Sequence, residues 1–491
     1  MRELRQSIAA SLREAIGKRR VLVFLPRGAD APHWESLLHE AGVDDVLLVE
    51  LDDDKLLSTI GAHQPVSGVT SHLQLQHAII DELTSSTPID PVVQQFDPKH
   101  QAVVLAPDPL DLTSTGGREV LGPKSAAARV VEYKTIIDSL WELACIDRAE
   151  AVVCDLSPRV PAVIRALGSP PGVVLSCEHR GTGPHAGGES MWWSLDGKLP
   201  SSFPSLDRPG IRLRIMPLLH GLPCRIHGMT SNGETAVFPP LELVSLPRPA
   251  SGTFFWAGAV PARTLTPAVR AHLHALTISI GTWLTAFGHS GAFAVDGIWT
   301  SQGYRPTELT PRLTSAFEGA EPMQRVLLDA ANLIARSGRR PAELSSLARL
   351  AEKALADRID IYGASSTASA SGRYALEWTP AGPRIDGTVP VRGFLGLGRS
   401  PRGWSLHARL QPDELSPDDP VGVLAPQVFK LSDEIFGTGF GELAPPFGLV
   451  PGLVPQPRIP TCLEEAAKHL AAGRPRSPLL CPPDHGHDRP G

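Results

Sequence analysis

Aromatic residues and cysteines are scarce in this sequence. Aromatic residues make up 5% of the 491 residues, and the 6 cysteines contain no Cys-x-x-Cys spacing. Close cysteine pairs would indicate a zinc or redox motif, and a regular cysteine framework would indicate a disulfide-stabilised secreted domain. Since neither pattern is present, we expect free thiols in a reducing, cytoplasmic location.

Long hydrophobic runs and an excess of basic residues are also missing. The apolar run Val21–Leu25 is far shorter than the roughly 20 residues that a transmembrane helix needs. Residues 1–20 alternate charged and apolar side chains and lack the apolar region of a signal peptide. The net charge of −6 comes from 46 basic and 52 acidic residues mixed along the chain. The sequence therefore predicts binding to neither a membrane nor a nucleic acid.

Glycine and proline are abundant, and the apolar content is sufficient for folded cores. The chain has 45 glycines and 48 prolines, and 42% of its residues are hydrophobic. Its length exceeds that of a single core, so about two to four domains are expected. Residues 1–124 predict a small open α/β sheet, although they contain neither a GxGxxG nor a Walker sequence. The expected elements there are helices at 3–18 and 33–40 and strands at 20–25, 46–51 and 102–106.

The pattern changes after Gly122. Residues 125–146 have apolar side chains near helical spacing and predict one helix, and strands then dominate to residue 297 around a helix at 266–286. Residues 322–358 are expected to be helical, and short strands follow. We expect domains at 125–320 and 321–447, the latter of mixed structure. Residues 448–491 are rich in proline and predict a disordered tail.

Two acidic residues flank a predicted turn at Ser301–Gly303. The segments on either side read as strands, so a hairpin would bring Asp296 and Glu308 to neighbouring positions. Thr310 lies two residues beyond Glu308 and would point to the same face of its strand. Magnesium is usually held by one or two carboxylates together with substrate phosphates. The pattern favours a magnesium site, and its alternative is a surface hairpin with an incidental carboxylate pair.

A glycine-rich segment lies between two further predicted strands. Gly181, Gly183, Gly187 and Gly188 fall within eleven residues, and glycine lets backbone amides approach an anion closely. An ordinary flexible hairpin would also explain this composition. Lys134 lies upstream in the helix expected at 125–146, where a solvated lysine is common.

Taken in order, these segments resemble the ATP-grasp superfamily. The residues Asp296 and Glu308-Leu-Thr310-Pro-Arg312 are similar to the acidic residue and Glu-x-Asn-x-Arg motif that end its catalytic domain, with threonine in place of asparagine. The resemblance implies ATP as cosubstrate and Mg²⁺ as metal. It assigns Asp296, Glu308 and Thr310 to the metal and Arg312 to the acylphosphate or carboxylate. It assigns to the nucleotide Lys134, Gly183, Gly187, Gly188, Ile215, Met216 and Glu242.

Four segments resemble, more narrowly, the actinobacterial peptide ligases of the pheganomycin-biosynthesis type. These are Leu222–Gly228, Val237–Glu242, Trp256–Ala259 and Gly291–Gly297. That resemblance implies an ATP-grasp fold preceded by a small α/β domain and followed by a mixed C-terminal domain. It implies an ATP-dependent ligase that joins a carboxylate to an amine or peptide through an acylphosphate, in secondary-metabolite biosynthesis. The oligomeric state is left open.

Three residues depart from the pattern of the superfamily. Tyr133 stands where an aspartate is usual, His220 where an acid is common, and Thr310 where asparagine is preferred. These departures favour an alternative, a nucleotide-binding protein of the ATP-grasp type that has lost catalysis. An α/β scaffold that binds no nucleotide is a third interpretation.

Overall fold

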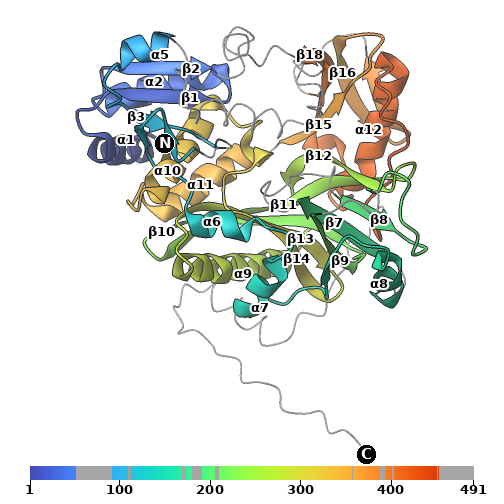
Figure 1. The fold of residues 1–491 in the computed structure, drawn as a ribbon. Helices are drawn as coiled ribbons and strands as arrows, with labels where there is room; N and C mark the ends of the chain where they lie inside the picture. The colour runs from blue at the N-terminus through green and yellow to red at the C-terminus, as the bar shows by residue number, and fades with distance from the viewer. Residues whose placement is uncertain are drawn as a thin grey trace, which may run out of the picture.

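The computed structural model describes residues 1–50, 91–108, 110, 112–167, 172–179, 191–204, 210–356, 358–386, 393–400, 403–450 and 452. Within these ranges the strands form three sheets, one largely parallel and two antiparallel (Figure 1). The expected class, multidomain α/β and α+β, is confirmed. The glycine-rich segment and nearly all of the predicted tail lie outside the described residues. No described helix has the length and apolarity needed to cross a membrane.

The N-terminal sheet has the strand order β2-β1-β3-β5-β4 among the described residues. Its first three strands are parallel, and all five residues of β1 are apolar and buried, as expected where helices cover a parallel sheet. The predicted helices and strands of this region are confirmed within two residues at nearly every end. They are α1 (Arg2–Ile16), β1 (Val21–Leu25), α2 (Ala31–Glu40), β2 (Val46–Glu50) and β3 (Val103–Leu105), followed by β4 (Ser114–Thr115) and β5 (Arg118–Val120), with α5 (Pro91–Phe96) before β3.

In the middle of the chain, nine strands of the described part form one antiparallel sheet in the order β14-β13-β10-β11-β12-β8-β7-β9-β6. Helix α9 (Pro267–Ala286) packs on it, and its N-cap Thr266 accepts a hydrogen bond from the Val269 amide at 3.4 Å. The strands are β6 (Val152–Asp155), β7 (Val173–His179), β8 (Met191–Ser194), β9 (Ile211–Pro217), β10 (Leu222–Ser231), β11 (Glu234–Arg248), β12 (Thr253–Pro261), β13 (Gly291–Thr300) and β14 (Gly303–Thr310); α8 (Val160–Leu167) follows β6.

The prediction of one helix over residues 125–146 is wrong. The chain forms α6 (Ala126–Val131) and α7 (Ile137–Leu143), separated by a turn that contains Lys134. The amides of Lys134 and Thr135 bond to the side chain of Glu178 and not to carbonyls one helical turn back. A distant carboxylate therefore takes the donors that a continuous helix would use.

The predicted helical stretch beyond residue 322 is two helices. Helices α10 (Pro322–Arg336) and α11 (Leu344–Leu355) are separated by a turn in which Gly338 has a φ of 80°. Both helices share a hydrophobic core with α1, α2 and residues of β10 and β11. A domain boundary at residue 321 stays a prediction, and by packing these helices lie with the N-terminal half of the chain.

The third sheet has the strand order β15-β19-β18-β16-β17 among the described residues, and α12 (Val421–Phe436) covers one of its faces (Figure 1). Leucine, isoleucine and phenylalanine side chains of the strands and of α12 form the core between them. The strands are β15 (Ile359–Ser365), β16 (Gly372–Thr379), β17 (Gly382–Asp386), β18 (Phe394–Ser400) and β19 (Gly403–Leu410).

Candidate active site

The predicted acidic hairpin is present. Strands β13 and β14 are antiparallel, and Asp296 and Glu308 are directly opposite each other in the register. A bulge beside Asp296 leaves Thr307 as an extra residue in β14, and its hydroxyl donates to the Asp296 carbonyl at 3.0 Å. The two carboxylates are 23% and 27% exposed, so each is accessible while its strand is fixed in the sheet.

Arg225 on β10 holds the first of these carboxylates. Its Nε and Nη2 donate to the two oxygens of Asp296 at 2.6 and 2.9 Å, a bidentate pair. Burial lowers the pKa of the Arg225 guanidinium, but the Asp296 charge and hydrogen bonds offset this, and the pKa is raised overall. The buried Nη1 of Arg225 has no hydrogen-bond partner in the described structure. A buried N–H group without a hydrogen-bond partner destabilises the folded protein, so Nη1 of Arg225 is suited to donate a hydrogen bond to a bound anion.

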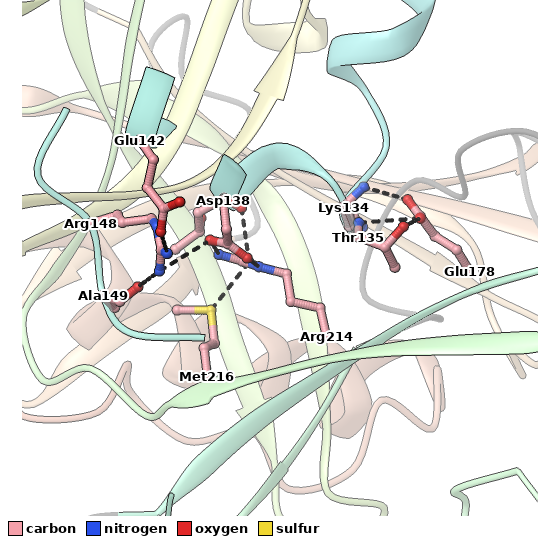
Figure 2. A network of polar contacts seen from close by, with 10 residues as sticks. Lys134, Thr135, Asp138, Glu142, Arg148, Ala149, Glu178, Arg214 and Met216 are labelled. Carbon is pink, nitrogen blue, oxygen red and sulfur yellow. Dashed lines mark hydrogen bonds and ion pairs between the residues drawn. The ribbon is translucent and has the colours of Figure 1, made fainter. Parts of the chain in front are cut away.

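Lys134 approaches the second carboxylate. Its Nζ lies 3.4 Å from Glu308 Oε2, and the lysine side chain is 4% exposed. The turn that carries Lys134 is fixed by Glu178, near the end of β7, which accepts hydrogen bonds from the Lys134 amide, from the Thr135 amide at 3.2 Å and from the Thr135 hydroxyl at 2.7 Å (Figure 2). The Lys134 ammonium is thus directed to the acidic hairpin by a buried carboxylate.

Arg214 connects the two ends of the nine-stranded sheet. From β9 it pairs with both oxygens of Asp138 on α7, at 2.6 and 2.7 Å (Figure 2). Its Nη1 donates to the carbonyl of Thr307, the residue before Glu308, at 3.1 Å, and lies 3.3 Å from the sulfur of Met216. Strand β9, which carries the predicted nucleotide-binding residues Ile215 and Met216, is thereby connected to the strand that carries Glu308.

The predicted nucleotide-binding residues Ile215 and Met216 lie where β9 stops pairing with β6. The side chain of Ile215 is fully buried in an apolar core, and that of Met216 is 5% exposed. The pairing with β6 ends at Ile215, whereas the pairing with β7 continues through Pro217. Within the assigned pairings, the backbone of Met216 therefore has a strand partner on one side only, which leaves the other side for a ligand.

Arg312 and Thr310 lie beside the hairpin. Thr310 is 8% exposed at the end of β14, opposite Ala294. Arg312 is 26% exposed, its Nε is 3.8 Å from a Glu132 oxygen, and that nitrogen has no hydrogen-bond partner in the part of the chain described. Glu132 also pairs with Lys124. Arg312 is therefore, after Arg225, a second guanidinium near the site that has an N–H group without a hydrogen-bond partner among the described residues.

Glu242 contacts the C-terminal region of the chain instead of the acidic hairpin. It is 1% exposed and accepts hydrogen bonds from the amides of Val421 at 3.1 Å and Gly422 at 2.6 Å, the first residues of α12. Burial raises the pKa of its carboxyl to about 7, although the two amides lower it. In this structure Glu242 caps a helix of the C-terminal region, and its assignment to the nucleotide stays a prediction.

The donor set at the hairpin fits a hard divalent cation. Two carboxylates lie opposite each other with Thr310 two residues beyond Glu308, and magnesium commonly takes one or two carboxylates and completes its shell with phosphates and water. The described residues contain no cluster of three or more histidine, cysteine or acidic side chains that would hold a metal without such help. Arg225 and Lys134 currently neutralise the two carboxylates, so a cation would have to share them.

No family model and no curated protein matches the sequence. Solved structures similar to it include an N5-carboxyaminoimidazole synthase from Aspergillus clavatus in complex with ADP and aminoimidazole ribonucleotide (15% identity, 85% of this chain and 99% of that one, TM-score 0.45). A phosphoribosylamine–glycine ligase from Thermotoga maritima has 12% identity over 87% of this chain and 100% of that one, TM-score 0.44. An ATP-grasp RimK-domain protein from Sphaerobacter thermophilus has 15% identity over 65% of this chain and 98% of that one, TM-score 0.34. These likenesses are too distant to assign an activity.

The sequence located the acidic hairpin and singled out Lys134 for the nucleotide, but it did not identify Arg225, Arg214 or Glu178. Arg225 and Arg214 lie in predicted strands, where alternating basic and apolar residues are also typical of an ordinary solvent-facing edge. Glu178 is the only acidic residue in the mostly apolar segment Val173–His179, and a carboxylate in such a segment was the signal that could have found it.

Proposed function

We propose that this protein is an ATP-grasp ligase that uses ATP to join a carboxylate to an amine. The observation that carries the proposal is the convergence of four residues, Lys134, Arg225, Asp296 and Glu308, from three separate segments of the chain. Two cations and two carboxylates in one place suit a magnesium–triphosphate group better than they suit a purely structural role. The motif resemblance to peptide ligases of the pheganomycin-biosynthesis type favours an amino acid or peptide as substrate.

In this proposal each residue has a defined task. The substrate carboxylate oxygen attacks the γ-phosphorus and ADP leaves; the amine then attacks the acyl carbon of the acylphosphate, loses a proton and releases phosphate. Asp296, Glu308 and the Thr310 hydroxyl hold Mg²⁺, which neutralises phosphate charge when bound. Lys134 turns from Glu308 to the phosphates, and Arg312 neutralises the acylphosphate. The glycines 183, 187 and 188 cover the phosphates, and the Met216 backbone pairs with adenine.

The alternative is a nucleotide-binding protein that has lost catalysis. Its support is the bidentate Arg225–Asp296 pair, which occupies both oxygens of one proposed metal ligand. Thr310 and Tyr133 also depart from the usual residues of the superfamily. Such a protein would bind ATP with magnesium but would form neither ADP nor a condensed product.

One experiment separates these functions. The full chain is incubated with ATP, Mg²⁺ and mixtures of amino acids and short peptides, and mass spectrometry follows condensation products while a coupled assay follows ADP. The ligase proposal predicts a product whose mass is the sum of two substrates minus water, formed with equimolar ADP. ATP binding without either product supports the alternative, and absence of ATP binding contradicts both.

A further inference from the structure

The C-terminal sheet has an unusual polar face on the side that α12 does not cover. In the register, Asp360 of β15 lies opposite Arg409 of β19, which lies opposite Phe394 of β18. Two residues further along β15, Tyr362 lies opposite His407 of β19, and both side chains point to the same face of the sheet as Asp360 and Arg409. The alternate residues of these strands fill the core under α12, so this face of the sheet is not needed for packing against that helix (Figure 1).

Positive charge exceeds negative charge on this face. Asp360 accepts hydrogen bonds from His407 Nε2 at 2.9 Å and from Arg409 Nε and Nη2 at 2.8 and 3.2 Å, and Arg358 Nε lies 3.7 Å away. Two further carboxylates lie close by: Glu318, which pairs with Arg27 at 3.2 Å and acts on Tyr362, and Glu321, which acts on Arg409. With Arg373 and Arg27 included, four arginines and a histidine therefore stand against three carboxylates. The Asp360 carboxylate is 8% exposed, whereas the side chains of Arg358, His407 and Arg409 are 24%, 34% and 30% exposed. The acid is therefore buried under bases that remain accessible to solvent.

A third arginine adds to this excess without an acidic partner. The guanidinium of Arg373 on β16 lies 3.7 Å from the ring centroid of Phe394, and among the described residues it pairs with no carboxylate. Tyr362 and His407 stack with ring centroids 4.7 Å apart. Arginines held against aromatic rings lose little further entropy when they bind an oxyanion, because their orientation is already restricted.

One edge of the face borders a segment that follows β14. Residues Arg358, Asp360 and Tyr362 line a hollow whose other wall includes Ser315, Ala316 and Gly319. Ser315 follows Arg312 by only three residues, and β12 contributes Trp256, which is 39% exposed, to the same hollow. The hollow thus places Arg358, at one edge of the face, beside the chain segment that follows Arg312.

We propose that this face, made by Arg358, Arg373, His407 and Arg409, binds an oxyanionic group of a ligase substrate, a carboxylate or phosphate other than the one that reacts. That the anion belongs to a ligase substrate rests on the proposed function. Binding of an oxyanion at this face does not depend on catalytic turnover. Guanidinium groups can donate two N–H bonds at once to the oxygens of a carboxylate or a phosphate. Asp360 orients Arg409 through two hydrogen bonds and lies 3.7 Å from Arg358, so the other donors of these arginines remain for a ligand. The substrate class is accordingly a small molecule or peptide that carries an additional acidic group.

The direct test measures binding of citrate and, separately, inorganic phosphate to the full chain by isothermal titration calorimetry at low ionic strength, without ATP. Two variants are compared, Arg373→Gln and the control Arg384→Gln, which lies on β17 of the same sheet and pairs with Glu377 at 2.8 Å. We expect Arg373→Gln to weaken binding about tenfold, the loss of one charge-assisted contact, and Arg384→Gln to leave it within about twofold. Tighter binding of citrate identifies a carboxylate site, and tighter binding of phosphate identifies a phosphate site.

Two results would overturn the inference. One is no saturable binding of either anion to the wild-type protein, and the other is equal weakening by both arginine variants, since general electrostatics would then suffice. If the ligase activity is found, Arg373→Gln should also raise the KM of acidic substrates and leave kcat unchanged, while neutral substrates are unaffected. If anion binding follows the prediction and no ligation occurs, the proposed function fails and the oxyanion site stands.

Discussion

Glu178 accepts hydrogen bonds from two consecutive residues of another segment, and it does so while 3% exposed. A buried carboxylate is stable only when donors satisfy it, and here the donors are the amides that set the direction of Lys134. At the scale of single residues, Lys134 is therefore positioned by Glu178, which contacts neither ATP nor substrate in the proposed reaction.

Replacing this acid should separate positioning from folding. Glu178→Gln exchanges one acceptor oxygen for an NH2 group that faces an N–H, so the Lys134 turn should loosen. We expect the KM for ATP to rise about tenfold, in line with the loss of hydrogen bonds to a charged group. Thr135→Val removes only the hydroxyl donor and should have a smaller effect in the same direction. Steady-state kinetics that give the same KM for Glu178→Gln and wild type would show that the contact is structural only.

Substitutions of Thr310 test whether its hydroxyl binds the metal together with Asp296 and Glu308. Thr310→Asn should preserve or lower the magnesium concentration for half-maximal activity, because the amide oxygen reaches further than the hydroxyl. Thr310→Val keeps the shape and removes the ligand, so several-fold more magnesium should be needed. Magnesium titrations of the three proteins decide the matter, and wild-type behaviour of Thr310→Val would mean that Thr310 binds no metal.

Local patterns predicted some parts of this site and missed others. A turn signal between two strands was enough to place Asp296 opposite Glu308, because hairpin register depends on nearby residues. The partners Arg225 and Glu178 act over 71 and 44 positions of the sequence. Those pairings arise from the sheet topology, and a single sequence carries no pattern that fixes them.

At the scale of elements, the break between α6 and α7 shows the same limit. Apolar spacing predicted one helix, and periodicity alone cannot report that a carboxylate from β7 takes two backbone donors. Helix α9 was predicted almost to the residue, and its start is defined locally by the N-cap Thr266 and by Pro267 in the first turn. Elements defined by their own sequence were thus found, and those defined by distant contacts were not.

The junction of β11 with α12 should make stability depend on pH. The pKa of the Glu242 carboxyl is raised to about 7 by burial, from an ordinary value of 4.5. Between pH 4.5 and pH 7 the Glu242 carboxyl stays protonated in the folded protein, whereas in the unfolded chain it has lost its proton. The unfolding free energy should therefore fall as pH rises from 4.5 to 7, by about 3 kcal/mol for this group.

Glu242→Gln should remove this contribution. Urea unfolding, followed by tryptophan fluorescence at pH 5 and pH 8, gives the free energy for wild type and variant. Burial lowers the pKa of His227 to about 3, which acts in the opposite direction, but it is present in both proteins and cancels in their difference. A difference between variant and wild type that stays constant from pH 5 to pH 8 would show that Glu242 is ionised throughout.

At the scale of the whole molecule, the nine-stranded sheet brings its two ends together. Arg214 of β9 reaches the carbonyl of Thr307 in β14, although these strands stand near opposite ends of the strand order. A nucleotide bound at Met216 could then present its phosphates to Lys134, Asp296 and Glu308. In the proposed reaction all of these groups act on one ATP molecule.

The most direct measurement uses the carboxylate substrate found in the condensation screen, labelled with ¹⁸O in both carboxylate oxygens. Attack on the γ-phosphorus predicts one labelled oxygen in each released phosphate, detected by mass spectrometry. Glu308→Gln should abolish this transfer, and the control Glu343→Gln, an exposed acid before α11, should not. Condensation that leaves the phosphate unlabelled, or full transfer in the Glu308→Gln protein, would contradict an acylphosphate ligase built on this site.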